Sequence, residues 1–139
     1  MVTGGGRVIG RAIAERLLTD GDAVTIVDRD PSVLAWAYHP RLTPVTGDAA
    51  VEATAERAAD LAQRAGTLVG WVNNAAVFRD PSPVPGPREV RDLVALNLDP
   101  TVVGCMTAVR RFVDARTGGA IVPVDGGRAA TGHDPEQPT

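Results

Sequence analysis

The chain has 139 residues, a formal net charge of −3 and 44% hydrophobic residues, values that are typical of one globular domain with a buried core. The charge balance gives no basic surface for nucleic acid, no apolar run approaches the roughly 20 residues of a membrane-spanning helix, and the single cysteine, Cys105, excludes a disulfide framework or a cysteine metal site. By elimination we expect a cytoplasmic protein with no nucleic-acid partner, no membrane contact and no metal.

The first ten residues predict a strand, a tight turn and the beginning of a helix. A short apolar start leads into Thr3 and three glycines, Gly4, Gly5 and Gly6. Glycine permits positive φ and lets backbone N–H groups approach a phosphate with no Cβ in the way. A helix is predicted over residues 8–19, because apolar residues recur there every four positions.

Strands and helices alternate along the rest of the chain, which predicts parallel βαβ units with right-handed crossovers. Further strands are predicted over residues 23–27, 41–46, 68–72 and 120–124, and Pro44 places the second of these at a sheet edge. Helices are predicted over residues 31–38, 49–65, 88–97 and 101–116, with a break at Asp99-Pro100, because proline disfavours helix at the residue before it. Residues 80–87 carry four prolines and predict an exposed loop. We expect one domain over residues 1–125 and a disordered tail over residues 126–139.

The segment Thr3-Gly4-Gly5-Gly6-Arg7-Val8-Ile9-Gly10 resembles the Thr-Gly-x-x-x-Gly-x-Gly turn of the short-chain dehydrogenase/reductase family. The resemblance continues in register over residues 1–122, at Asp28, Asp48, Asn73-Asn74-Ala75-Ala76 and Asn97. It implies a doubly wound, Rossmann-like α/β fold, with about five parallel strands in the order 3-2-1-4-5 and helices on both faces in three α/β/α layers. The alternative for the glycines is a tight turn that holds no ligand.

The resemblance also implies a nicotinamide cofactor at the carboxyl ends of strands one and four. The residues that would bind it are Thr3, Gly4, Gly6, Arg7, Ile9, Gly10, Asp28, Arg29, Asp48, Ala49, Asn74, Ala75 and Ala76. A carboxylate at Asp28 accepts hydrogen bonds from both hydroxyls of an adenosine ribose and repels a 2′-phosphate, which favours NAD over NADP. Arg7 and Arg29 would weaken that preference, since arginine suits a 2′-phosphate.

Several of these positions also have a structural interpretation. Asp28 could be a solvated loop acid, Asp48 could be the N-cap of the following helix, and Asn73 and Asn74 could satisfy backbone groups in a turn. Val8 stands where the family has its second glycine. A β-branched residue suits positive φ poorly, so we expect weak cofactor binding.

The catalytic set that the resemblance implies is largely missing from the sequence. In the family a serine and a Tyr-x-x-x-Lys pair carry the reaction, with tyrosine as the general acid/base. Here Asp125 and Gly126 stand where the serine should be, Leu42 occupies the lysine position relative to Tyr38, and the sequence contains no lysine. Asn97 is a catalytic remnant that would support a water-linked proton relay or, alternatively, a helix-interrupting residue bonded to nearby backbone.

The end of the last predicted strand, residues 121–127, resembles the family's C-terminal Val-Asp-Gly-Gly ending, so we expect a truncated member: a shortened gene product, a fragment or a misread frame.

Three hypotheses about function follow. The first is an NAD(H)-dependent oxidoreductase that moves hydride between the nicotinamide and a small alcohol or carbonyl substrate. The second is a remnant that binds NAD weakly and performs no chemistry. The third is an interaction protein, a homo-oligomer or a partner of a full-length relative, that uses Val102, Val103, Met106, Val109 and Val113. The missing catalytic residues favour the second hypothesis.

Overall fold

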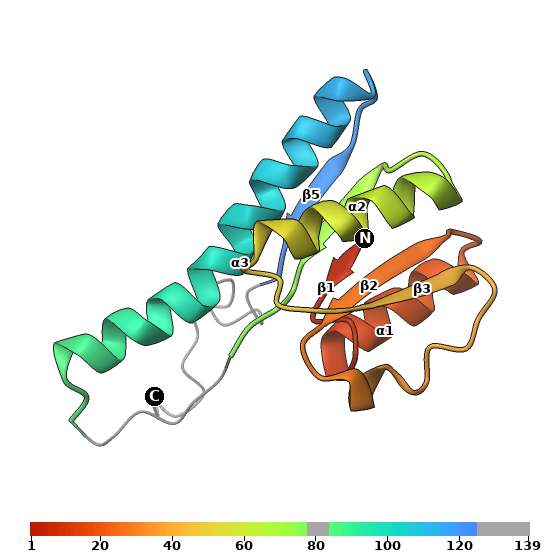
Figure 1. The fold of residues 1–139 in the computed structure, drawn as a ribbon. Coiled ribbons are helices and arrows are strands. Elements are labelled where there is room, and N and C mark those ends of the chain that lie inside the picture. Colours follow the sequence, from red (N-terminus) through yellow and green to blue (C-terminus); the bar gives the residue numbers. More distant parts are fainter. Residues whose placement is uncertain (78–83, 125–139) are drawn as a thin grey trace, which may run out of the picture.

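The computed structural model describes residues 1–77 and 84–124. Its elements are β1 (Val2–Thr3), α1 (Val8–Thr19), β2 (Val24–Asp28), the 3₁₀ turn η1 (Pro31–Leu34), β3 (Leu42–Thr46), α2 (Glu52–Ala65), β4 (Gly70–Asn73), α3 (Pro87–Asp114) and β5 (Ala120–Pro123). The strands form one parallel sheet in the order β3-β2-β1-β4-β5, shown in Figure 1. The predicted fold class and strand order are therefore confirmed, and β3 lies at an edge as Pro44 predicted.

The sheet carries helices on both faces. α1 packs on one face, where Val2, Ala14, Leu18 and Ile26 belong to one buried cluster. α2 and α3 pack together on the other face (Figure 1), where a second cluster includes Trp71, fully buried, and Phe112. The strands alternate between these clusters, because successive side chains of a strand point to opposite faces.

The face of the sheet that holds α1 is covered unevenly. α1 contacts β1 and β2, and Val72 of β4 still packs against the α1 cluster. Val122 of β5 pairs in register with Val72, yet 47% of Val122 is exposed. In the described ranges, this outer part of the sheet is left more open to solvent than the centre.

The predicted break in the helix at Asp99-Pro100 is wrong. α3 is one helix from Pro87 to Asp114 and contains Pro100 in its interior. A proline inside a helix removes one backbone hydrogen bond and its ring crowds the carbonyl four residues earlier, at a cost of about 3 kcal/mol, but here Pro100 is buried while Thr107, Ala108 and Phe112 pack the following turns into the fold. Tertiary packing therefore overrides the local preference for a break.

α3 also differs from its prediction in length and exposure. An 18-residue window of α3 has a mean hydropathy of 1.2 and is 22% buried, so the helix could span a membrane by length and composition alone. The expectation that no apolar segment approaches that length does not hold for α3. The helix nevertheless packs on α2 and β4, while its N-terminal half extends beyond the sheet (Figure 1).

Smaller differences concern element ends. α2 begins at Glu52 rather than at position 49, and the predicted helix over 31–38 is a single 3₁₀ turn. Of the predicted proline-rich loop, Pro87 is already the first residue of α3. Positions 78–83 and the predicted tail over 126–139 lie outside the described residues.

Candidate functional site

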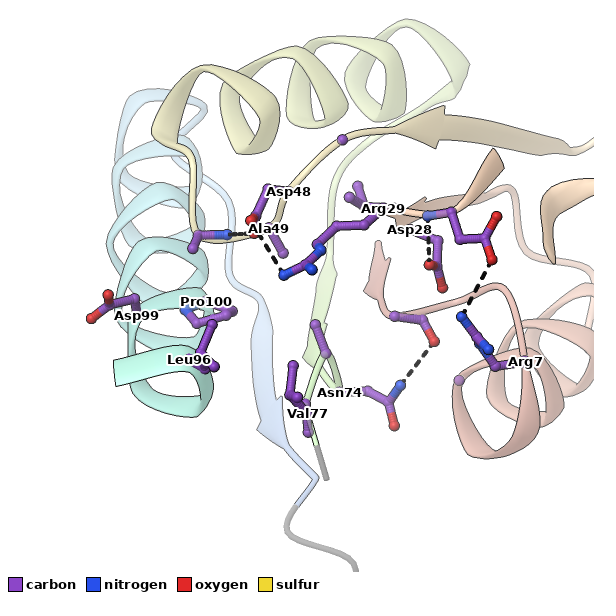
Figure 2. A pocket seen from close by; sticks show the side chains of 18 of the residues that line it. Arg7, Asp28, Arg29, Asp48, Ala49, Asn74, Val77, Leu96, Asp99 and Pro100 are labelled. Atoms are coloured by element: carbon purple, nitrogen blue, oxygen red, sulfur yellow. Dashed lines mark hydrogen bonds and ion pairs between the residues drawn. The ribbon is translucent and has the colours of Figure 1, made fainter. Parts of the chain in front are cut away.

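A pocket of about 970 Å³ opens at the carboxyl ends of the central strands. Its walls come from the glycine turn after β1, the loops after β2 and β3, the segment after β4 and the N-terminal half of α3 (Figure 2). In a parallel sheet of this order, the direction in which successive strands are added reverses between β1 and β4, and that switch point is where doubly wound folds bind ligands.

The turn after β1 requires glycine for two separate reasons. Gly4 has φ +64°, a region that side chains disfavour, and a Cβ there would lie 2.9 Å from Ala75 Cα. A Cβ on Gly10 would overlap the carbonyl oxygen of Gly4. The turn, the first helical turn of α1 and the segment after β4 are therefore in close backbone contact.

Thr3 and Asn74 fasten that contact with their side chains. Thr3 Oγ1 accepts hydrogen bonds from the backbone N–H groups of Asn74 at 3.0 Å and Ala75 at 3.1 Å. Asn74 Nδ2 donates to the carbonyl oxygens of Thr3 at 3.1 Å and Gly4 at 3.0 Å. Both side chains are thus bonded to backbone, which fits the structural interpretation of Asn74.

Asn73 points to the other side of the sheet. Its Oδ1 accepts a bond from Trp71 Nε1 at 3.0 Å, and its Nδ2 donates to Cys105 Sγ at 3.3 Å. Asn73 is buried and does not line the pocket. Its role in the described structure is to join β4 to α3.

The N-terminus of α1 has no side-chain cap. Arg7 occupies the N-cap position, its side chain makes no capping hydrogen bond, and the first turn contains no acidic residue. The first N–H groups of a helix need partners from outside it, and together with the helix dipole they favour an anion. Because Arg7, Val8, Ile9 and Gly10 all line the pocket, this helix end suits a phosphate.

Val8 adopts a positive φ, a conformation that suits a β-branched residue poorly. Its φ is +46°, in the left-handed region that costs a side-chain-bearing residue roughly 1–2 kcal/mol. The side chain is 77% exposed and makes part of the pocket wall. A β-branched residue is therefore strained at the pocket wall, beside the N-terminus of α1.

Acidic residues and arginines alternate around the pocket rim. Asp28 Oδ2 accepts from the Gly6 N–H at 3.0 Å and Asp28 Oδ1 from the Asp30 N–H at 3.2 Å. Arg7 lies 3.6 Å from Asp30, and Arg29 lies 3.6 Å from Asp48, as Figure 2 shows. Arg7 and Arg29, the two arginines that could bind a 2′-phosphate on the ribose, therefore each lie beside a carboxylate.

Two of these acids are held by neighbouring backbone groups. Hydrogen bonds from the Ser32 side chain and backbone lower the pKa of Asp30, and the charge of Arg7 acts in the same direction. Asp48 Oδ1 accepts from the Ala50 N–H at 2.9 Å. The alternative interpretation of Asp48 as a helix N-cap is wrong, because the N-cap of α2 is Val51.

Asn97 joins the segment after β4 to α3. Its Oδ1 accepts from the Val77 N–H at 2.9 Å, while its Nδ2 donates to the carbonyl oxygens of Val77 at 3.1 Å and Leu93 at 2.9 Å. The helix is not interrupted there, so that half of the alternative is wrong. Tyr38 is 90% exposed and is not among the residues that line the pocket.

Most of the predicted cofactor residues come together around one pocket. Thr3 and Gly6 lie behind its wall; those that line it are Gly4, Arg7, Ile9, Gly10, Asp28, Arg29, Asp48, Ala49, Asn74, Ala75 and Ala76. Val8, which the sequence flagged as unfavourable for cofactor binding, also lines the pocket, and sequence reasoning missed a further set: Val27, Asp30, Gly47, Ala50, Val77, Asp92, Ala95, Leu96, Asp99 and Pro100. Asp30 could have been predicted, because it is a second acidic residue close after the end of β2. The residues of α3 reach the pocket because of the angle at which the helix packs, and no local sequence pattern encodes that angle. Within residues 1–77 and 84–124, no three His, Cys, Asp or Glu side chains are grouped to hold a metal ion.

The family model for short chain dehydrogenase matches residues 1–133 of this chain. Sorbitol dehydrogenase from Cereibacter sphaeroides is 32% identical over 127 residues, which are 88% of this chain and 50% of that protein. Ipsdienol dehydrogenase from Ips pini is 37% identical over 81 residues, 58% of this chain and 32% of that protein. This chain thus spans half or less of the length of these relatives.

Solved structures show the same relationship. A short-chain dehydrogenase from Streptomyces avermitilis superposes with a TM-score of 0.71 at 27% identity. The match covers 88% of this chain and 46% of the chain in that structure. A short-chain dehydrogenase from Novosphingobium aromaticivorans has a TM-score of 0.73 at 29% identity, with 88% of this chain and 50% of its own covered.

Proposed function

This chain belongs to the short-chain dehydrogenase family of oxidoreductases, and on that premise we propose that it binds NAD(H) in the pocket after β1 and does not turn over substrate as a 139-residue polypeptide. The observation that carries the proposal is the uncapped N-terminus of α1 beside a glycine turn that a Cβ would obstruct. A pyrophosphate supplies the negative charge and the acceptor oxygens that this backbone requires.

The carboxylates at the rim support NAD over NADP. Asp28 lies at the end of β2, where a carboxylate accepts hydrogen bonds from ribose hydroxyls and repels a 2′-phosphate. Asp30 and Asp48 add negative charge nearby, and each engages an arginine at 3.6 Å. A 2′-phosphate would have to displace those ion pairs before it gained an arginine of its own.

A titration with NADH and NADPH tests the cofactor. We expect NADH to bind more tightly than NADPH, and Asp28→Ala to weaken NADH about tenfold more than it weakens NADPH, because hydrogen bonds to a charged group contribute about 1.5–3 kcal/mol. Asp22→Ala is the matched control, since Asp22 precedes β2 at the opposite end of the strand. Failure of the wild type to bind either nucleotide, or equal losses for both in Asp28→Ala, contradicts the proposal.

The proposed lack of turnover is supported by the missing lysine and by the position of the tyrosine. The sequence has one tyrosine, Tyr38, and no lysine, and Tyr38 does not line the pocket. General acid–base catalysis contributes typically 10²–10⁴-fold, and the sequence has no tyrosine–lysine pair to supply that contribution. Steady NADH oxidation with simple ketones, above a protein-free blank and abolished by Asn97→Ala, would overturn this part of the proposal.

One observation favours an additional role in self-association. Along α3, the apolar residues Leu98, Val102, Met106, Val109 and Val113 are each 48–68% exposed, and their spacing of three or four places them along one side of the helix. Val103, which was predicted to belong to this surface, packs instead against the cluster that contains Trp71 and Phe112. Exposed apolar stripes of this kind mark interaction surfaces, and we infer a homo-oligomer in which α3 meets a second copy. Sedimentation velocity should show a dimer that Val109→Glu dissociates and that Val69→Glu, at an exposed valine outside α3, leaves intact; a monomeric wild type contradicts it.

A further inference from the structure

Trp36 contacts the glycine turn from outside the pocket. Its indole Nε1–H donates a partly buried hydrogen bond to the carbonyl oxygen of Gly6 at 2.9 Å. Neither Trp36 nor Gly6 lines the pocket, whereas the next residue, Arg7, does. The indole therefore restrains the turn from the side opposite to a bound ligand.

The direction of one backbone N–H follows from this hydrogen bond. The carbonyl of Gly6 and the N–H of Arg7 belong to the same peptide unit, and in a trans peptide they point in opposite directions. Among the described residues no peptide bond is cis. A carbonyl held toward Trp36 thus directs the Arg7 N–H to the pocket side, next to the first N–H groups of α1.

Three further contacts make this arrangement rigid. The Gly6 N–H donates to Asp28 Oδ2 at 3.0 Å, so both polar groups of Gly6 are occupied. A Cβ on Gly6 would overlap Val33 Cγ2, which shows how closely the segment leading to Trp36 packs on the turn. The guanidinium of Arg11 lies 4.8 Å from the centroid of the Trp36 ring, a cation–π contact that holds the indole against α1.

We propose that Trp36 is a positioning residue for the diphosphate of the bound nucleotide: its indole N–H fixes the Gly6–Arg7 peptide so that the Arg7 N–H faces the phosphate oxygens. This inference rests on the proposed dinucleotide site and adds a residue that lies outside the pocket wall. Without the indole N–H, the Gly6 carbonyl loses its partner and the peptide is free to rotate. Its oxygen can then turn toward the phosphates, which repel it.

The test compares ligands with and without a diphosphate. Trp36→Phe keeps an aromatic ring for Arg11 and removes only the donor. We expect it to raise the dissociation constant of ADP about five- to tenfold, the effect of one hydrogen bond, and to leave that of adenosine unchanged. A general loosening of the fold would weaken both ligands together.

Trp71→Phe is the matched control. It also deletes an indole N–H hydrogen bond, the one from Trp71 Nε1 to Asn73 Oδ1, but on the α3 side of the sheet and away from the pocket. With all proteins measured at a temperature where circular dichroism shows them folded, Trp71→Phe should bind ADP like the wild type. Equal losses of ADP affinity in both variants overturn the inference.

A second measurement needs no variant. In ¹⁵N-labelled wild-type protein, the amide resonance of Arg7 should shift downfield on addition of ADP and stay in place on addition of adenosine. An unresponsive Arg7 amide, or a Trp36→Phe variant with wild-type affinity for ADP, overturns the positioning role while the nucleotide site stands. A wild type that binds neither ADP nor NADH overturns the proposed function and this inference with it.

Discussion

Val8 is the residue at which the sequence and its backbone conformation conflict most directly. With φ +46° and a largely exposed side chain, it gains little packing to offset its strain. Val8→Gly should raise the free energy of unfolding by about 1 kcal/mol, because glycine adopts left-handed φ without a Cβ penalty. It should also tighten NADH binding, since it clears the pocket wall beside the first turn of α1.

Urea denaturation and an NADH titration check this prediction against Ala12→Gly. Ala12 is an exposed residue of the same helix, where glycine costs about 1 kcal/mol. The two substitutions should therefore move stability in opposite directions. A loss of stability in Val8→Gly would show that Val8 is not strained.

At this scale, the sequence predicted which residues gather at the pocket better than it predicted what each side chain does. The spacing of the glycines and the position of Asp28 depend on chain geometry that a motif records. Whether Asn74 bonds to a ligand or to the carbonyls of Thr3 and Gly4 depends on which groups of separate segments lie within hydrogen-bond distance of its side chain. No local pattern encodes those distances, and the hydrogen bond from Trp36 to Gly6 escaped prediction for the same reason.

At the level of elements, α2 and α3 are joined by a cluster of ion pairs. Arg110 Nη2 lies 2.7 Å from Glu56 Oε1, and Arg111 Nε lies 2.9 Å from Glu56 Oε2. Partial burial would raise the pKa of Glu56, but the hydrogen bonds and charges of Arg110 and Arg111 outweigh it and lower the pKa. Glu56 thus contributes stability that is present above the ordinary glutamate pKa and is lost as the pH falls through the lowered value in the folded protein.

Glu56→Gln should therefore lower the free energy of unfolding by about 1 kcal/mol at pH 7, and the deficit should shrink toward zero as the pH falls below about 4. Glu15→Gln, which breaks the exposed pair of Glu15 with Arg11, should cost less than about 0.5 kcal/mol. Urea titrations at several pH values measure both. A deficit for Glu56→Gln that does not change with pH would assign the loss to packing rather than to charge.

Elements with a strong internal pattern were predicted well, and elements that depend on their neighbours were not. α1 has the predicted bounds, 8–19, because its apolar period and its end at Asp20-Gly21 are local. The continuity of α3 through Pro100 depends on packing against α2 and β4, which lie far away in the sequence. A local rule for proline could not anticipate it.

For the whole molecule, the pocket joins segments from both halves of the sheet, so a ligand there should stabilise the complete fold. NADH at ten times its dissociation constant should add about 1.4 kcal/mol to the free energy of unfolding and raise the melting temperature by a few degrees. Differential scanning calorimetry measures the shift, with adenosine at the same concentration as the weaker ligand. A melting temperature that NADH does not change would contradict nucleotide binding by the native state.

The two tryptophans are placed so that each reports on a different side of the sheet. Trp71 belongs to the cluster beneath α2 and α3, whereas Trp36 packs against the cluster beneath α1. Replacing either one leaves a single emitter, so the melting of each layer can be followed by its own fluorescence. Coincident curves would show that the sheet and both helical layers unfold in one cooperative step. Separated curves would show which layer unfolds first.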